Sequence, residues 1–294
     1  MKKTALFIGD VSWDTTVLAG RIPAPDEKIV VEQWVEGVGG VAANAAVACS
    51  LAGGRVTLFS SVGDDASGAA VKTALSAFGI DMRIALTKGA TTRAIIVLDD
   101  LGEKRLFLDP GSSMYPGPEV IRSMSLEDVG WVHTALYDHE RAAELIQRCR
   151  EANVPWSIDL EPATIPDDIK DLTAHISGCQ SLILNERAHD QLGGNAVQLL
   201  LDMGVKEVIE TLGPDGVRLH SVDTEPIHVT PFSTDSPVVD TTGAGDAFAG
   251  WYLAERLNGT ELPVALKRAV NAASHSVRFL GASASYQTRS TILD

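Results

Sequence analysis

The sequence of 294 residues predicts an α/β fold in which helices cover both faces of a mainly parallel sheet. Short apolar runs, typical of buried strands, alternate with longer helical segments along most of the chain. Strands separated by helices usually pair in parallel, because the helix returns the chain to the edge where the previous strand began. No linker and no internal repeat interrupts the pattern, so we expect a single domain over 1–294.

The alternation begins with the apolar run at 5–9, which ends at a glycine and is typical of a buried central strand. An alanine-rich helix is expected at 44–51, where Gly53 and Gly54 end it. The remaining elements are expected as strands at 56–61, 131–133, 156–159, 181–184 and 207–211, and as helices at 67–78, 140–152, 242–257 and 263–277.

Two stretches, 15–36 and 93–109, do not follow the alternation. The second reads as two strands around an Asp-Leu-Gly-Glu turn at 100–103. We assign both stretches to an accessory β-sheet that covers the site as a lid, with limits near 12–38 and 90–112. The alternative is that they form edge strands of the main sheet and have no functional motion.

Acidic residues outnumber basic ones, with 39 Asp and Glu against 24 Lys and Arg and a net charge of −15. This charge repels nucleic acids and anionic membranes, so neither is an expected partner. No apolar stretch approaches the roughly 20 residues that cross a bilayer. The cysteines, Cys49, Cys149 and Cys179, lie far apart and form no Cys-x-x-Cys pair, which favours a reducing cytoplasm.

The segment most informative about function is 239–250, VDTTGAGDAFAG. Its small residues stand at a loop-to-helix junction, where a glycine-rich turn lets several N–H groups point at one anion. The helix dipole adds to that positive potential. Asp246 follows in the first helical turn, so its carboxylate can accept a proton beside the same anion. Alone it could be an inert helix N-terminal carboxylate, but the whole run favours phosphoryl transfer.

The run DTTGAGDAFAG resembles the C-terminal motif of the ribokinase-like, or PfkB, carbohydrate kinases, whose members phosphorylate sugars and nucleosides from ATP. The resemblance spans nearly the whole chain. It implies the three-layer ribokinase-like fold with a small β-sheet lid. It also implies an anion hole formed by the amides of Gly243, Ala244 and Gly245, with Asp246 as the catalytic base.

The segment 37–46, GVGGVAANAA, resembles the di-glycine motif with which this family binds sugar hydroxyls. Gly39 and Gly40 would let the backbone approach a ligand closely. Asn44 offers both a donor and an acceptor, which suits a hydroxyl group. Taken by itself, the segment could equally be a helix start whose glycines serve packing.

Asp14 resembles the family's carboxylate that holds a pair of sugar hydroxyls, and a carboxylate that accepts two O–H donors fixes a polyol well. Asp10 competes for this role. Where ribokinase proper has a lysine after the two glycines, this chain has Val41, which weakens the case for ribose as the acceptor.

The segment 211–217, TLGPDGV, follows a strand and resembles the family's ATP-side turn, so Thr211, Gly213 and Gly216 are expected at the nucleotide. The tight bend of an ordinary hairpin would look the same. The resemblance also places Asn185 at the nucleotide and Asn271 near the adenine. An Asn within a helix is commonly just a local hydrogen-bond partner.

The family usually has Asn, two variable residues and Glu at an acidic site connected to Mg²⁺, but the run here is NERA at 185–188. Glu186 or Asp190 could substitute, or ATP itself could hold the ion. Several family members also bind a monovalent cation such as K⁺. The corresponding positions, where an ordinary loop contact is the alternative, are Asp240, Thr242, Gly281 and Ser285.

We therefore expect a cytoplasmic, ATP-dependent kinase that phosphorylates a hydroxyl of a small carbohydrate, as ribokinases and fructokinases do. The sugar would lie between Asp14 and Asn44, and exposed lid strands could pair two subunits into a homodimer. A nucleoside kinase of the same fold is the alternative. A non-catalytic sugar sensor and a dinucleotide-dependent oxidoreductase are the other classes. The oxidoreductase would need its glycine-rich turn directly after the first strand, where DVSWD stands.

Overall fold

The computed structural model describes residues 3–99, 104–112, 114–222, 224–231 and 237–293. A nine-stranded sheet forms the centre, in the order β13-β12-β11-β10-β9-β8-β1-β4-β5. Its strands pair in parallel except at β11–β12 and β12–β13, which are antiparallel. The strands are β1 (Thr4–Ile8), β4 (Val56–Gly63), β5 (Asp81–Thr87), β8 (Val129–Ala135), β9 (Trp156–Leu160), β10 (Ser181–Asn185), β11 (Glu207–Thr211), β12 (Val217–Ser221) and β13 (Ile227–Val229).

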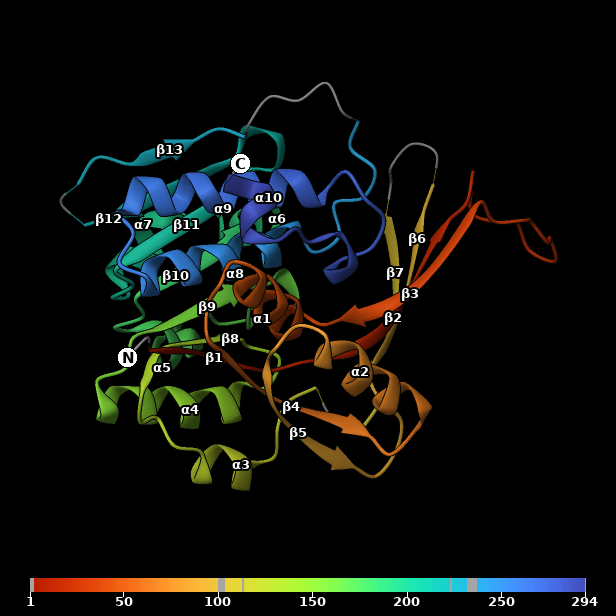
Figure 1. Ribbon diagram of the computed structural model, residues 1–294. Coiled ribbons are helices and arrows are strands. Elements are labelled where there is room, and N and C mark those ends of the chain that lie inside the picture. Colours follow the sequence, from red (N-terminus) through yellow and green to blue (C-terminus); the bar gives the residue numbers. More distant parts are fainter. Residues whose placement is uncertain (1–2, 100–103, 113, 223, 232–236, 294) are drawn as a thin grey trace.

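Two hydrophobic cores lie on opposite faces of this sheet, because successive side chains of a strand point to opposite faces. Phe7 of β1 belongs to one core, whereas its neighbours Leu6 and Ile8 belong to the other. Strands buried on both faces are typical of parallel sheets covered by helices. The alternation predicted from the sequence is therefore confirmed as a three-layer α/β fold (Figure 1).

Each core is covered by its own set of helices. The first core is covered by α1 (Val41–Leu51), α2 (Ala66–Ser76), α8 (Ala244–Leu257), α9 (Leu262–Ser276) and α10 (Arg289–Leu293). The second is covered by α3 (Pro118–Ser123), α4 (His139–Ala152), α5 (Thr173–Ile176), α6 (Glu186–Leu192) and α7 (Ala196–Asp202). Short 3₁₀ helices occupy Pro162–Thr164, Ile169–Leu172, Gly213–Asp215 and Ser283–Ser285.

The close packing of α1 on α8 places the functional residues. α1 is almost entirely small and buried, from Ala42 to Cys49. Gly250 of α8 lies directly against it, since a Cβ built there would stand 2.3 Å from the carbonyl oxygen of Ala45. Any larger residue at 250 would push the helices apart. The glycine therefore brings the N-terminal turns of both helices side by side, at the carboxyl edge of the sheet.

A second sheet of four strands, in the order β3-β2-β6-β7, projects from the side of the main body (Figure 1). Its strands are β2 (Ser12–Leu18), β3 (Gln33–Gly39), β6 (Arg93–Leu98) and β7 (Lys104–Asp109), and β2 pairs with β6 in parallel. The two stretches outside the alternation therefore form a separate sheet and not edge strands of the main one. The turn predicted at 100–103 lies outside the described residues.

Some elements were not predicted from the sequence. They are β5 at one edge of the main sheet, the antiparallel β12–β13 extension at the other, and the short helices α3, α5, α6, α7 and α10. Among the described helices, none combines the length and apolar character that crossing a membrane requires.

Candidate active site

Asp246 stands in the first turn of α8, as the sequence predicted, and its side chain is buried. Its Oδ2 accepts a hydrogen bond of 2.9 Å from Nδ2 of Asn44, on the first turns of α1. The Oδ1 of Asn44 is buried and has no hydrogen-bond partner among the described residues. The residues predicted to be base and hydroxyl ligand therefore touch, although 202 positions separate them in the chain.

The N-terminus of α8 presents unpaired backbone donors. The N–H groups of Gly243, Gly245 and Asp246 have no acceptor within the part of the chain that the structure describes, whereas Ala244 donates a long bond of 3.3 Å to the Thr241 carbonyl. A Cβ built on Gly245 would meet no atom within 4 Å, so open space adjoins these donors. Unpaired amides at a helix N-terminus beside open space are a ready anion-binding site.

The turn that exposes these amides depends on Gly243, which has a φ of 77° and precedes the first residue of α8. A Cβ there would lie 2.4 Å from the hydroxyl oxygen of Tyr286, and that hydroxyl donates a 2.7 Å hydrogen bond to the Gly243 carbonyl. Only glycine combines this left-handed backbone with so close a neighbour. Tyr286 thus fixes the orientation of the loop.

Burial raises the pKa of Asp246 to about 8. The hydrogen bond from Asn44 lowers that pKa, the negative charges of Glu161 and Asp10 raise it, and the positive charge of Lys104 lowers it. A carboxylate held in this environment is a stronger proton acceptor than a solvated one, which suits a general base.

Asp10 and Asp14, the two candidates for the sugar-binding carboxylate, have different hydrogen-bond partners. Asp10, just after β1, accepts hydrogen bonds of 2.9 Å and 3.1 Å from the amides of Val41 and Ala42. It therefore caps the N-terminus of α1 with both carboxylate oxygens. Asp14, on β2, accepts 2.6 Å from the hydroxyl of Ser12, and burial raises its pKa to about 6.

The di-glycine segment holds Asp14 close to the backbone. A Cβ on Gly39 would lie 1.8 Å from Oδ2 of Asp14, so the carboxylate occupies the space that any side chain would need. Gly40 precedes the first residue of α1 with a φ of 95°, and a Cβ there would lie 2.8 Å from the Asp10 carbonyl oxygen. Both glycines are thus required by close approaches to the chain's own Asp14 and Asp10, which is the packing role given above as the alternative.

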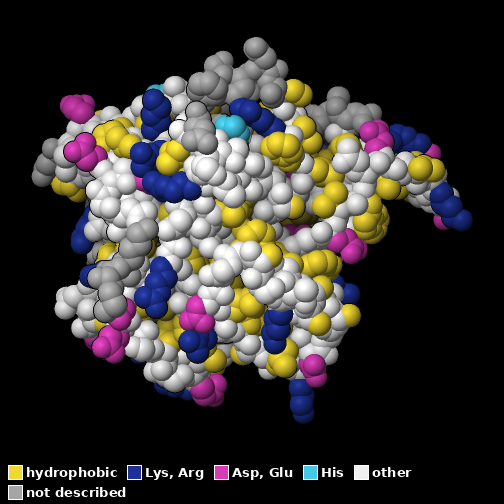
Figure 2. All heavy atoms as spheres, in the orientation of Figure 1, with side chains coloured by type: hydrophobic (Ala, Val, Ile, Leu, Met, Phe, Trp, Pro, Cys, Tyr) yellow, Lys and Arg dark blue, Asp and Glu magenta, His cyan; other side chains and the backbone are white. Residues whose placement is uncertain are grey.

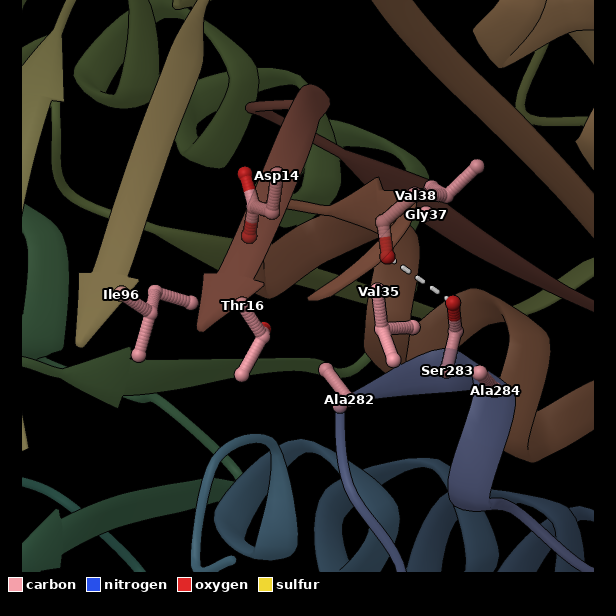
Figure 3. A pocket seen from close by; sticks show the side chains of 10 residues that line it. Asp14, Thr16, Val35, Gly37, Val38, Ile96, Ala282, Ser283 and Ala284 are labelled. Atoms are coloured by element: carbon pink, nitrogen blue, oxygen red, sulfur yellow. Dashed lines mark hydrogen bonds between the residues drawn. The ribbon is translucent and has the colours of Figure 1, made fainter. Parts of the chain in front are cut away.

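Asp14 lines a pocket between the small sheet and the segment 281–284. Figure 3 shows side chains of β2, β3 and β6 on one side of it and Ala282, Ser283 and Ala284 on the other. Ser283 Oγ closes one end by donating 2.9 Å to the Val38 carbonyl. The pocket volume is about 20 Å³, enough for about one water molecule and far too small for a monosaccharide. This pocket alone therefore does not hold an acceptor.

The residues predicted at the nucleotide occupy the neighbouring edge of the main sheet. Asn185 ends β10 and Thr211 ends β11, and these residues are register partners. Gly213 begins the 3₁₀ turn that follows, and Gly216 closes it, since a Cβ on Gly216 would lie 2.1 Å from the Val229 carbonyl oxygen. Asn271 lies half-buried on α9. Ligands of open α/β sheets bind at such carboxyl edges.

Comparisons with known proteins agree with this arrangement. Residues 2–289 match the family described as "pfkB family carbohydrate kinase". The chain belongs to the pfkB family of carbohydrate kinases. A relative from Halopiger xanaduensis, named ATP-dependent ribose-1-phosphate kinase, is 31% identical over 270 residues, which cover 90% of this chain and 88% of the relative. The ribokinase of Haemophilus influenzae is 26% identical over 307 residues, covering 100% and 98% of the two chains.

Solved structures resemble this pfkB family kinase over its whole length. The ribokinase of Arabidopsis thaliana, described as complexed with ribose and ATP, aligns with a TM-score of 0.84 and covers 100% of this chain and 98% of its own, at 23% identity. The likeness confirms the ribokinase-like fold predicted from the sequence. The predicted enzyme class, an ATP-dependent phosphotransferase that acts on sugars, is confirmed as well.

In this kinase several polar groups at the active site were not predicted from the sequence. Asp159 is the residue before the end of β9 at Leu160, and Glu161 follows the strand. Burial raises the pKa of both carboxyls; the charges of Glu161, Asp246 and Asp10 add to the effect at Asp159, and the charge of Asp10 adds to it at Glu161. Burial raises the pKa of Tyr137, just after β8, and the charges of Asp10, Glu161, Asp159 and Asp246 add to this effect. Their position could have revealed them, because each of these residues lies at or just after the end of a strand, at the edge of the sheet that carries Asp10.

A magnesium site of protein ligands is not formed by the described residues of this kinase, since no group of three or more His, Cys, Asp or Glu side chains among them could hold a metal. Ala188, at the position of the family's Glu, is fully buried. Glu186 is exposed and approaches the 213 turn, as its Oε2 lies 3.8 Å from a Cβ built on Gly213. Asn185 Oδ1 accepts 2.9 Å from the Ala188 amide and so caps α6.

Three of the four residues predicted at a monovalent cation site, Asp240, Thr242 and Gly281, bond to one another. Asp240 is buried and accepts 2.8 Å and 2.6 Å from the amide and hydroxyl of Thr242, and 2.9 Å from the Gly281 amide. Ser285 Oγ donates 2.7 Å to the Ala282 carbonyl. Because protein donors already bond to the Asp240 carboxylate, this set fits a K⁺ ion poorly. Its hydrogen bonds instead join the phosphate-side loop, residues 240–243, to the segment that begins at Gly281.

Proposed function

We propose that this chain transfers the γ-phosphoryl group of ATP to a hydroxyl of a small neutral monosaccharide, with Asp246 as general base. The observation that supports it best is the buried Asp246 carboxylate directly beside the unpaired amides of Gly243, Gly245 and Asp246 itself. Phosphoryl transfer needs little covalent chemistry from a protein beyond this combination of a proton acceptor and fixed donors.

In the proposed reaction the acceptor hydroxyl lies near Asn44 and Asp14 and attacks the γ-phosphorus in line with the bond to the β-phosphate. A P–O bond to the sugar forms, the P–O bond to ADP breaks, and the hydroxyl proton passes to Asp246. The amides at the α8 N-terminus donate hydrogen bonds to the oxygens of the transferring group and so stabilise its negative charge, as helix N-termini do for phosphates. The small sheet acts as a lid and excludes water, which would otherwise accept the phosphoryl group.

Magnesium would enter with the nucleotide. When bound, the ion offsets the charge of the phosphate oxygens. Glu186 is the acidic side chain predicted nearest to it, and since Mg²⁺ keeps several waters in most sites, contact through water suffices. Asn185, Thr211 and the 213–216 turn would hold the nucleotide on the β10–β11 edge, with Asn271 of α9 on the adenine side.

The acidity of the acceptor side argues for an uncharged sugar. Asp10, Asp14, Asp159 and Glu161 surround the route to Asp246, and the pKa of each is raised by burial. Removal of a phosphate-bearing acceptor from water into this environment would cost free energy through like-charge repulsion. The relative from Halopiger xanaduensis acts, by its name, on a sugar phosphate, so this chain is expected to differ from it in acceptor.

Coupled ADP release tests the proposal, with D-ribose, 2-deoxy-D-ribose, D-fructose, adenosine and ribose 1-phosphate as acceptors. We expect turnover with a neutral sugar and slower turnover with ribose 1-phosphate. Adenosine as the best substrate would assign the chain to the nucleoside kinases. ADP release with none of these acceptors, or equal release from Asp246→Asn, would refute the proposed reaction.

We also propose a homodimer formed through the lid. Trp34, Ile95 and Phe107 share the outer face of the small sheet by their strand register, and their side chains are 59%, 47% and 64% exposed. Figure 2 shows hydrophobic side chains along this projecting arm. A hollow of about 760 Å³ between this face and α2 continues the apolar surface. Apolar patches of this kind mark interfaces.

Light scattering distinguishes the two oligomeric states. A mass of twice 31.2 kDa is expected for the wild type, and the monomer mass for Phe107→Asp. A monomeric wild type at working concentrations would remove the dimer from the proposal. For localisation we propose the cytoplasm, which is supported by Cys49, Cys149 and Cys179 being buried free thiols.

A further inference from the structure

We propose that Lys104, carried by lid strand β7, is a catalytic residue that the lid brings to the transferring phosphoryl group. The proposal rests on the proposed function and adds a group that the phosphate-side loop itself lacks. In the site described above, the negative charge of the phosphoryl oxygens faces backbone amides on one side and buried carboxylates on the other. A mobile cation between them would change the rate of transfer without binding the sugar.

The first observation is a contact between the lid and the phosphate-side loop. Nζ of Lys104 lies 3.5 Å from Oγ1 of Thr242, which directly precedes Gly243 of the anion hole. The proton of the Thr242 hydroxyl is donated to Asp240 over 2.6 Å, so its lone pairs face the ammonium group. An ammonium group with three rotatable donors needs only a small shift to exchange this neutral oxygen for a phosphate oxygen.

The second observation is the face of the lid on which Lys104 lies. Lys104 pairs with Leu98, and in the same strand register Ile96 pairs with Thr16 and Ala94 with Asp14. Side chains at alternate positions share a face, so Lys104 lies on the face that carries Asp14 and Thr16. This is the face that lines the pocket against 281–284. Its neighbour Arg105 lies on the opposite face and pairs with Asp99 at 2.9 Å.

The third observation is the balance of charge around the base. Burial and the neighbouring acids Asp10 and Glu161 raise the pKa of Asp246, and Lys104 opposes this effect at both Asp246 and Glu161. Lys104 is thus near enough to act on the groups that surround the reacting phosphate. A cation placed there reduces the repulsion between the γ-phosphate and these carboxylates, which is largest when charge develops on the phosphoryl oxygens.

The position of Lys104 on the lid has a mechanistic meaning. Asp14, the predicted ligand of the acceptor, and Lys104 belong to the same small sheet, so one movement of the sheet would displace both side chains. When the sheet is open, Lys104 is withdrawn and the bound nucleotide lacks its cation. When the sheet closes over an acceptor, Lys104 returns to the loop at Thr242. Phosphoryl transfer is thereby linked to the presence of the sugar, and transfer to water stays slow.

Three variants test this role. Lys104→Met removes the charge with a side chain of similar length, and Lys104→Arg restores a charge. Arg105→Met is the matched control, because it removes the same charge from the adjacent residue on the opposite face. Loss of one donor from a transition-state site typically costs about 100-fold to 1,000-fold in kcat. We expect Lys104→Met to lose about 100-fold in kcat with an acceptor KM within about threefold of wild type, Lys104→Arg to recover most of that loss, and Arg105→Met to behave as wild type.

Binding of ADP with aluminium fluoride, a mimic of the transferring phosphoryl group, gives a readout that does not need turnover. Calorimetry in the presence of the acceptor should show Lys104→Met weakening this complex at least tenfold while ADP alone binds unchanged. Turnover of Lys104→Met within threefold of wild type, an equal loss in Arg105→Met, or unchanged affinity for the mimic would each overturn the assignment. A wild type inactive on every acceptor would instead refute the proposed function.

Discussion

Replacement of Asp246 by Asn should abolish turnover and at the same time stabilise the folded protein as the pH rises. The pKa of Asp246 is about 8 in the folded protein against an ordinary value of 3.8. Below the ordinary value both states hold the proton and the carboxyl contributes nothing. Between these values the unfolded chain is ionised while the folded chain keeps the proton, so wild-type stability falls with pH. Each pH unit in this window is worth about 1.4 kcal/mol.

From pH 4 to pH 7 the wild type should therefore lose about 4 kcal/mol at most relative to Asp246→Asn, because the side chain is buried and little screened by water. Urea unfolding at half-unit pH intervals measures this difference. Asp64→Asn, at an exposed position after β4, is the control and should not diverge from wild type. Kinetics should show a loss of at least about 1,000-fold in kcat with ADP affinity retained. A constant difference in stability across the window, or near-normal turnover, would refute the reasoning.

Further predictions concern the core, the acceptor and the pH profile. Glu255 is fully buried and bonded to Arg268 and Arg289, so Glu255→Ala should lower the free energy of urea unfolding by about 3–5 kcal/mol, whereas a loss below 1 kcal/mol would contradict a paired buried charge. Gly39→Ala should raise the acceptor KM at least about tenfold with unchanged ADP affinity, since its Cβ needs the space of the Asp14 carboxylate. The kcat/KM of the wild type should rise through a group with a pKa near 8, and a profile already flat above pH 6 would speak against Asp246 as the titrating base.

The longer helices, the central strands and both glycine motifs could be predicted because their signals are local. A glycine-rich turn before Asp246 and an apolar run ending at Gly9 carry their meaning within a few residues. Asp159 and Glu161 could not be found in this way, because WSIDLEP is an ordinary strand end until strand order places β9 between β8 and β10. The contact between Asn44 and Asp246 likewise depends on the packing of α1 on α8, which Gly250 permits.

The lid was predicted as a pair of stretches that broke the alternation, and the structure confirms their separate sheet. Its register and orientation were beyond sequence reasoning, because a two-residue period assigns side chains to faces without saying which face meets the active site. From the sequence alone, nothing distinguished Lys104 from the other charged residues of the stretch 93–109. Its contact with Thr242 and its face of the sheet distinguish it from Arg105, its neighbour in sequence.

Hydrogen bonds that start at Asp240 connect the loop before α8, proposed to receive the phosphate, with the strand β3, which leads to the proposed sugar site. Asp240 holds Thr242 and Gly281, and Ser283 in turn holds the carbonyl of Val38 on the strand that leads to the di-glycine segment. A sugar that displaces this strand pulls on the loop that receives the nucleotide. Affinities for the two substrates should consequently be interdependent, and by thermodynamic reciprocity each must alter the other by the same factor. Binding of both substrates would then favour the arrangement from which the phosphoryl group is transferred.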